Sequence, residues 1–153
     1  MYITTSRKPS DKTRKIARLF ANFIGTYENR GKKSIEELVE RAKELGENRI
    51  MILSESKGNP NTINIISINE EWAWIEPEII FSIESNKIPD TKKIGKQVKY
   101  KGDKQYSHLF DSQEPDTDDV ILVDMNDKRL SFSYKKSKIS INIKQLKKLV
   151  QMD

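Results

Sequence analysis

Hydrophobic positions in the first third of the chain alternate between strand-like stretches and segments with helical spacing. Residues 2–5 and 26–28 are short β-forming stretches, and residues 49–54 contain a continuous apolar run. Between them, apolar residues recur at three- and four-residue intervals, first at Ile16, Leu19, Phe20, Phe23 and Ile24, then at Ile35, Leu38, Val39, Ala42 and Leu45. The pattern predicts a β-α-β-α-β order whose third strand is buried on both faces, as in a parallel α/β sheet.

Residues at the predicted helix ends agree with this pattern. Ser10 is a suitable N-cap for a helix that begins at Asp11, and Gly25 is a natural stop. Ser34 and Glu37 have the spacing of a capping box at the start of the second helix. We expect that helix to end at the glycine in position 46.

The second half has a weaker pattern. Residues 62–69 alternate like a half-buried strand, and a further strand is expected near residues 79–83. Residues 120–123 predict another short strand, residues 113–119 an acidic loop, and residues 130–134 and 139–143 a hairpin around a basic turn. We expect a short helix through Leu146, Leu149 and Val150 to follow.

Composition excludes several classes of site. The chain has 153 residues, the size of one ordinary domain, with no cysteine and one histidine. Disulfides, thiolate metal sites and multi-histidine zinc sites are therefore excluded, and we expect no cofactor. Neither a membrane-spanning apolar run nor an apolar signal core is present in the sequence, which predicts a soluble, cytoplasmic protein with no membrane partner.

Charge is segregated along the chain, although the net charge is only +5. Residues 1–33 hold nine basic and two acidic residues, a local charge of +7, and residues 128–152 hold eight basic residues and no acidic one. Residues 103–127 hold eight carboxylates and one lysine. A heat-adapted or AT-biased composition would explain abundant charge but not its segregation. Segregation favours a surface that binds a polyanion.

Three polar, basic turns stand out as candidate phosphate-binding segments, at residues 4–10, 29–34 and 56–60. Serines at helix starts offer N–H groups to anions, glycines permit close approach, and arginine forks onto phosphate oxygens. Loops at the carboxyl ends of parallel strands share an edge, so the first and third turns are expected to meet. With the adjoining helix face and the late hairpin, the candidate RNA-binding residues are Thr5, Ser6, Arg7, Lys8, Ser10, Lys12, Arg14, Lys15, Arg30, Lys32, Lys33, Lys57, Asn59, Lys135, Lys136 and Lys138.

Three segments follow one another along the chain: TTSRKPS, then NRGKKS with its helix, then an apolar strand followed by ESKGNPNTI. In order and spacing they resemble the Brix-domain family, most closely its short archaeal members. The resemblance covers roughly residues 1–68. It implies an α/β fold, with a single Brix domain over residues 1–153 made of two similar halves, approximately 1–85 and 86–153. Each half would resemble the anticodon-binding domain of class II aminoacyl-tRNA synthetases.

The family's motifs fall on specific residues of this chain. Its N-terminal basic motif matches Thr5, Ser6, Arg7, Pro9 and Ser10, its Asn-Arg-Gly turn matches Asn29, Arg30 and Gly31, and its Gly-x-Pro turn matches Gly58 and Pro60. The sequence departs from the family at Phe132-Ser133-Tyr134, where serine stands in place of an arginine between two aromatic residues. The neighbouring lysines of the hairpin are possible substitutes.

The function implied by the resemblance is a non-catalytic ribosome biogenesis factor. It would bind ribosomal RNA or its precursor as a monomer and assist rRNA processing, folding or pairing with a guide RNA, together with assembly proteins. The alternative is a basic module that docks on assembly factors without touching RNA, and steep salt dependence would distinguish RNA binding from it. An enzyme based on Asp116, Asp118, Asp119 and Asp124 is the weakest interpretation, because no nucleophile and base accompany them.

Overall fold

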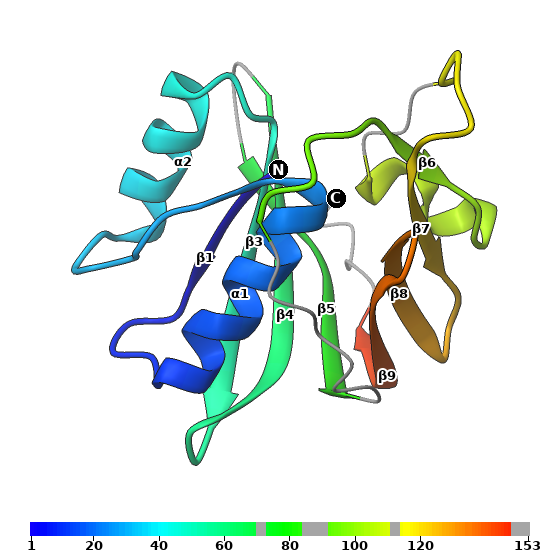
Figure 1. The fold of residues 1–153 in the computed structure, drawn as a ribbon. Coiled ribbons are helices and arrows are strands. Elements are labelled where there is room, and N and C mark those ends of the chain that lie inside the picture. Colours follow the sequence, from blue (N-terminus) through cyan, green and yellow to red (C-terminus); the bar gives the residue numbers. More distant parts are fainter. Residues whose placement is uncertain (70–72, 84–91, 111–113, 148–153) are drawn as a thin grey trace.

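One mixed β-sheet organises the part of the chain that a computed structural model describes, namely residues 1–69, 73–83, 92–110 and 114–147 (Figure 1). The strand order is β2-β1-β3-β4-β5-β9-β8-β7-β6. The strands are β1 (Tyr2–Thr5), β2 (Thr26–Tyr27), β3 (Arg49–Ser56), β4 (Asn59–Ile68), β5 (Ala73–Ile83), β6 (Val98–Tyr100), β7 (Ile121–Met125), β8 (Arg129–Tyr134) and β9 (Ser137–Lys147). The helices are α1 (Asp11–Ile24), α2 (Ile35–Glu44) and the 3₁₀ helix η1 (Lys104–Leu109).

The first five elements have the predicted order β1-α1-β2-α2-β3. β1 lies between β2 and β3 and pairs with both in parallel, while β4 and β5 continue the sheet in antiparallel fashion. Residues 50–53 of β3 are all buried, as the continuous apolar run predicts. The prediction of an α/β class is thereby confirmed for this region.

The two helices cover opposite faces of the sheet. Successive residues of a strand point to opposite sides, and Met51 and Leu53 pack with α1 while Ile50 and Ile52 pack with α2. Both predicted N-termini are present, with Ser10 capping α1 and a full capping box at Ser34 and Glu37. Local sequence signals therefore fix the helix starts that lie beside the basic turns.

A second set of strands, β6 to β9, joins the first set, β1 to β5, through the antiparallel pairing of β5 with β9. β9 forms the predicted hairpin with β8, β7 pairs with β8, and β6 lies parallel to β7 at the far edge. The prediction of a helix through Leu146 is wrong, because Leu146 pairs with Ile79 of β5 and β9 continues to Lys147. Leu149 and Val150 lie outside the described residues. The sequence pattern did not predict β6 or η1.

Aromatic packing ties α1 to the second set of strands. The ring of Phe132 on β8 lies 5.4 Å from that of Phe20 and 6.0 Å from that of Phe23, centroid to centroid, with both partners on α1. It also lies 6.2 Å from the ring of Phe110, which follows η1. A single hydrophobic core therefore extends from β1 to β9 on the α1 face. None of the described helices is both long and apolar enough to span a membrane.

Candidate nucleic-acid interface

The first and third basic turns lie together at one end of the sheet. β1 and β3 run parallel with Thr5 opposite Leu53, so the segments that follow them leave the sheet on the same side. The Oγ of Ser10 lies 2.9 Å from the carbonyl oxygen of Gly58, and the Nζ of Lys12 donates to the Oδ1 of Asn59 at 2.9 Å. The expectation that these two turns share an edge is confirmed.

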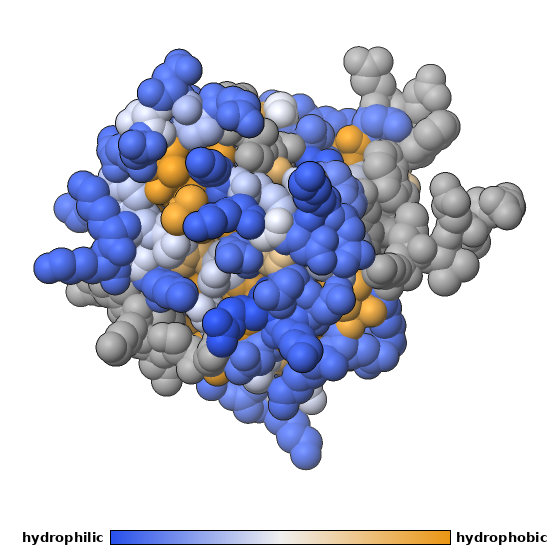
Figure 2. Space-filling model, turned by 90° about the vertical axis from the view of Figure 1, so that its right-hand side faces the viewer, coloured by the Kyte–Doolittle hydropathy of each residue, from blue (hydrophilic) through white to orange (hydrophobic). Residues whose placement is uncertain are grey.

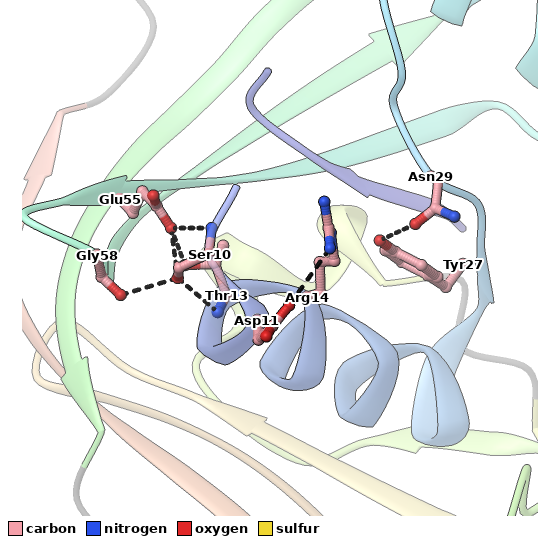
Figure 3. A network of polar contacts seen from close by, with 8 residues as sticks. All are labelled: Ser10, Asp11, Thr13, Arg14, Tyr27, Asn29, Glu55 and Gly58. Atoms are coloured by element: carbon pink, nitrogen blue, oxygen red, sulfur yellow. Dashed lines mark hydrogen bonds and ion pairs between the residues drawn. The ribbon is translucent and has the colours of Figure 1, made fainter. Parts of the chain in front are cut away.

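The start of α1 is occupied by a carboxylate of the chain itself (Figure 3). Glu55 lies on β3 at a break in register, and its Oε2 accepts from the Ser10 backbone N–H at 3.0 Å. The Ser10 Oγ lies 2.8 Å from the same oxygen, and the buried Thr13 hydroxyl also donates to it. These donors hold the pKa of the Glu55 carboxyl below its ordinary value, with the Thr13 hydroxyl as the largest cause.

This arrangement changes the role expected of Ser10. The sequence suggested that N–H groups at this helix start would receive an external anion, whereas the Ser10 N–H is already engaged by Glu55. Sequence reasoning missed Glu55, and the available signal was an acidic residue directly before the Ser56-Lys57-Gly58 turn. Through these hydrogen bonds Glu55 joins the first turn to the third, and the cations Arg7, Lys8 and Lys57 on these two turns remain exposed.

Arginines link the first turn to the second. Arg30 donates from Nη1 to the Thr5 carbonyl oxygen at 3.3 Å and from Nε to the Lys33 carbonyl oxygen at 2.9 Å. Arg7 reaches the Lys32 carbonyl oxygen from Nη2 at 3.5 Å. Burial, followed by the nearby charge of Arg7, lowers the pKa of Arg30. Arg30 is thus half-buried and holds the backbone of both turns, while Arg7 stays exposed.

Exposure separates the sixteen predicted residues into supporting and accessible groups. Thr5 is fully buried, and its hydroxyl donates to the Ser6 carbonyl oxygen, so its side chain supports the turn. The half-buried residues are Ser6, Ser10, Arg14, Arg30 and Lys33. The exposed ones are Arg7, Lys8, Lys12, Lys15, Lys32, Lys57, Asn59, Lys135, Lys136 and Lys138. We use the name basic-turn surface for the exposed members of this predicted set that lie on the three linked turns, at their edges or in the first turn of α1, namely Arg7, Lys8, Lys12, Lys32, Lys57 and Asn59.

Three of the candidate lysines share an uncommon backbone conformation. Lys8, Lys57 and Lys135 all have φ of 52°, in the left-handed region that side chains other than glycine seldom adopt. Lys57 precedes Gly58, whose φ is 78°, and the pair forms the two-residue connection between β3 and β4. Lys57 and Lys135 thus lie exposed in the tight turns between paired strands, and Lys8 lies exposed in the bend between β1 and α1.

The β8–β9 hairpin is a separate basic element. β5 and β9 pair with Ile83 opposite Ile141, and the hairpin tip at Lys135 lies six residues before Ile141. At about 3.3 Å per residue, the tip lies roughly 20 Å along the strand from that pair. The hairpin also carries an acidic partner, because the Tyr134 hydroxyl donates to Asp119 at 2.6 Å and Asp119 lies 3.0 Å from the Nζ of Lys96. The hydrogen bonds that join the three turns do not include this hairpin.

Neither a metal centre nor a broad apolar surface is evident in the described part of the chain. No group of three or more acidic or histidine side chains there could hold a metal ion. Figure 2 shows that the face beside β6–β9 is mainly hydrophilic, with small, separate hydrophobic spots. The large hydrophobic side chains exposed among the described residues are Ile35, the first residue of α2, and Leu45, its C-cap.

Comparisons with known proteins agree with the resemblance seen in the sequence. No family model matches the chain. A probable Brix domain-containing ribosomal biogenesis protein of Archaeoglobus fulgidus is 44% identical over 70 residues, which are 45% of this chain and 42% of that protein. The corresponding protein of Pyrococcus furiosus is 39% identical over 80 residues, 49% of this chain and 35% of its own. The matched segments span less than half the length of these curated relatives.

Solved structures extend the likeness to the whole fold. A probable ribosomal biogenesis protein from Aeropyrum pernix K1 superposes with a TM-score of 0.70 at 20% identity and covers 99% of this chain and 97% of its own. An archaeal Imp4-like protein has a TM-score of 0.68 at 21% identity, with coverage of 97% and 99%. The resemblance to the Brix-domain family is therefore confirmed: the chain is a sequence relative of archaeal Brix domain-containing ribosomal biogenesis proteins and has the fold of the solved archaeal proteins.

Proposed function

We propose that the chain acts without catalysis in ribosome biogenesis, by binding ribosomal RNA or its precursor through the basic-turn surface. In this role it assists rRNA processing, folding or pairing with another RNA. The observation that carries the proposal is the linkage of three basic turns from distant parts of the sequence into one surface at one end of the sheet. The names of the curated relatives support the biological setting.

The chemistry of this surface suits a phosphate backbone. Five exposed cations gather on the turns and on the first turn of α1, and Arg30 and Glu55 fix the backbone of the turns, so the backbone loses little conformational freedom when a ligand binds. Arginine can fork onto phosphate oxygens, and lysine adds point charges that displace condensed counterions. Such contacts position an RNA strand without reading its sequence, since RNA specificity resides mainly in shape and unpaired bases.

We further propose that the domain consists of two similar halves that meet near residue 85. The pairing supports this division, because β6 and β7 are parallel and are followed by antiparallel β8 and β9. In the first half, β1 and β3 are likewise parallel and are followed by antiparallel β4 and β5. Each half would correspond to one anticodon-binding-like unit, with η1 in the place of α1.

The proposal predicts that removing cations from the basic-turn surface weakens RNA binding and reduces its salt dependence. Arg7→Gln and Lys32→Gln change exposed side chains. Log affinity falls linearly with log salt, and each variant should make this fall less steep, by about 0.7–0.9 in the magnitude of the slope for each phosphate that is no longer neutralised. Fluorescence anisotropy with a labelled ribosomal RNA fragment at several salt concentrations measures both quantities.

Lys101→Gln is the matched control. Lys101 is also exposed, but it follows β6 at the opposite edge of the sheet from β2 and β1. Equal losses of affinity in all three variants would mean that binding depends on net charge alone, and unchanged slopes in Arg7→Gln and Lys32→Gln would remove these turns from the interface. Salt-insensitive binding to an assembly protein, with no RNA binding, would favour the docking alternative.

A further inference from the structure

An aromatic and cationic pair lies beside the basic-turn surface and is not part of it. Tyr27 is on β2, the edge strand of the sheet, and its half-buried ring packs against the main core. The guanidinium carbon of Arg18, an exposed residue on α1, lies 5.3 Å from the centre of that ring. This separation is within the range of an attractive cation–π contact.

Two further groups surround the pair. Arg14 lies one helical turn before Arg18, and the charges of both arginines counteract the rise in the Tyr27 pKa that burial causes. The Tyr27 hydroxyl donates to the Oδ1 of Asn29 at 2.8 Å (Figure 3). Asn29 begins the second basic turn, so the pair and the basic-turn surface are continuous through the backbone at residues 27–32.

These groups match the requirements of an unpaired nucleotide better than those of a phosphate alone. A guanidinium is planar and weakly hydrated, and it stacks on flat π-systems, whereas a phosphate requires only charge. The Tyr27 ring restrains the Arg18 side chain from one side while the residue remains exposed. A guanidinium held in this way can receive a base on its outer side, as arginine does in proteins that bind unpaired RNA.

We propose that Arg18 and Tyr27 form a stacking subsite for an unpaired RNA base, flanked by Arg14 and by the amide of Asn29. The inference rests on the proposed RNA-binding function and adds to it a preference for single-stranded segments. Bases within a duplex are already stacked on one another, so only an unpaired nucleotide can occupy the subsite. The basic-turn surface then holds the phosphates on the 3′ or 5′ side of that nucleotide.

A comparison of two probes tests this subsite. One probe is an unpaired RNA oligonucleotide of about a dozen nucleotides, and the other is an abasic sugar–phosphate backbone of the same length, with both measured at the same salt concentration. Stacking on a protein side chain contributes about 1–3 kcal/mol per base, so the chain should prefer the oligonucleotide with bases by roughly fivefold or more. Arg18→Lys keeps the charge and removes the planar group, and it should bring this ratio close to one while leaving affinity for the abasic backbone unchanged.

Tyrosine variants provide a second arm. Tyr27→Leu should reduce the preference as Arg18→Lys does, whereas Tyr27→Phe keeps the ring and should retain most of it; thermal unfolding checks that each variant is folded. Equal affinity of the unsubstituted chain for both probes, or a preference that persists in Arg18→Lys, would overturn the stacking subsite while leaving backbone binding in place. Failure to bind either probe at low salt would overturn the proposed function as well.

Discussion

Phe132→Ala is expected to lower the free energy of unfolding by about 3–5 kcal/mol, the range for truncating a large buried aromatic side chain. Phe132 is 1% exposed and contacts the rings of Phe20 and Phe23 on α1 and of Phe110 beyond η1. Removal of its ring leaves a cavity where α1 packs against the second set of strands. Urea denaturation followed by circular dichroism measures the change in stability.

Phe132→Leu is the appropriate control, since it retains an apolar side chain and should be destabilised less than Phe132→Ala. The unfolding transition should stay single in both variants, because α1 and the strands on either side of β5 share one core. A destabilisation below about 1 kcal/mol for Phe132→Ala, or two separate transitions in the unsubstituted chain, would contradict the single core.

Glu55→Ala is expected to lower the free energy of unfolding by about 2–4 kcal/mol and to weaken RNA binding. The carboxylate accepts from the Ser10 N–H and from the buried Thr13 hydroxyl. Hydrogen bonds to charged groups contribute about 1.5–3 kcal/mol each, and solvent reduces this contribution for Glu55, which is half-buried. Without Glu55, the buried Thr13 hydroxyl is deprived of this acceptor, and the main link between the first and third turns is removed. Chemical denaturation and RNA titration of the same variant measure the two effects.

The Glu55 contribution should also depend on pH in a defined direction. The pKa of the folded carboxyl lies below the ordinary value of 4.5, so the unfolded chain binds the proton more tightly than the folded one. The stabilisation is therefore fully present above about pH 4.5 and is lost as the pH falls through the folded pKa. The stability difference between the unsubstituted chain and Glu55→Gln should shrink below pH 4.5, and a constant difference down to about pH 3 would contradict this assignment.

Helix starts and the early strands could be predicted from the sequence because their determinants are local. Ser10 and the Ser34–Glu37 pair cap their own helices within three residues. The continuous apolar run of β3 indicates that the strand is buried on both faces. The meeting of the first and third turns also followed from a general rule for parallel strands. These features depend on short-range chemistry or on topology, both of which the sequence pattern carries.

Other features depend on pairings between distant residues. Leu146 has a spacing compatible with a short helix, and the register of β9 against β5 makes it part of a strand instead. Glu55 contacts Ser10, which is 45 residues away in the sequence, at a register shift in β3 that no local sequence pattern predicts. The three-residue β6 and the 3₁₀ helix η1 are too short and too polar to give a periodic signal.

The affinity of the unsubstituted chain for ribosomal RNA fragments as a function of salt tests the proposed function most directly. An unrelated RNA of equal length serves as the reference. We expect tight binding at low salt, a steep linear fall of log affinity with log salt, and a preference for particular ribosomal fragments that contain unpaired nucleotides. Absence of binding to any RNA at low salt would contradict the proposed function and leave a protein partner as the ligand of the basic-turn surface.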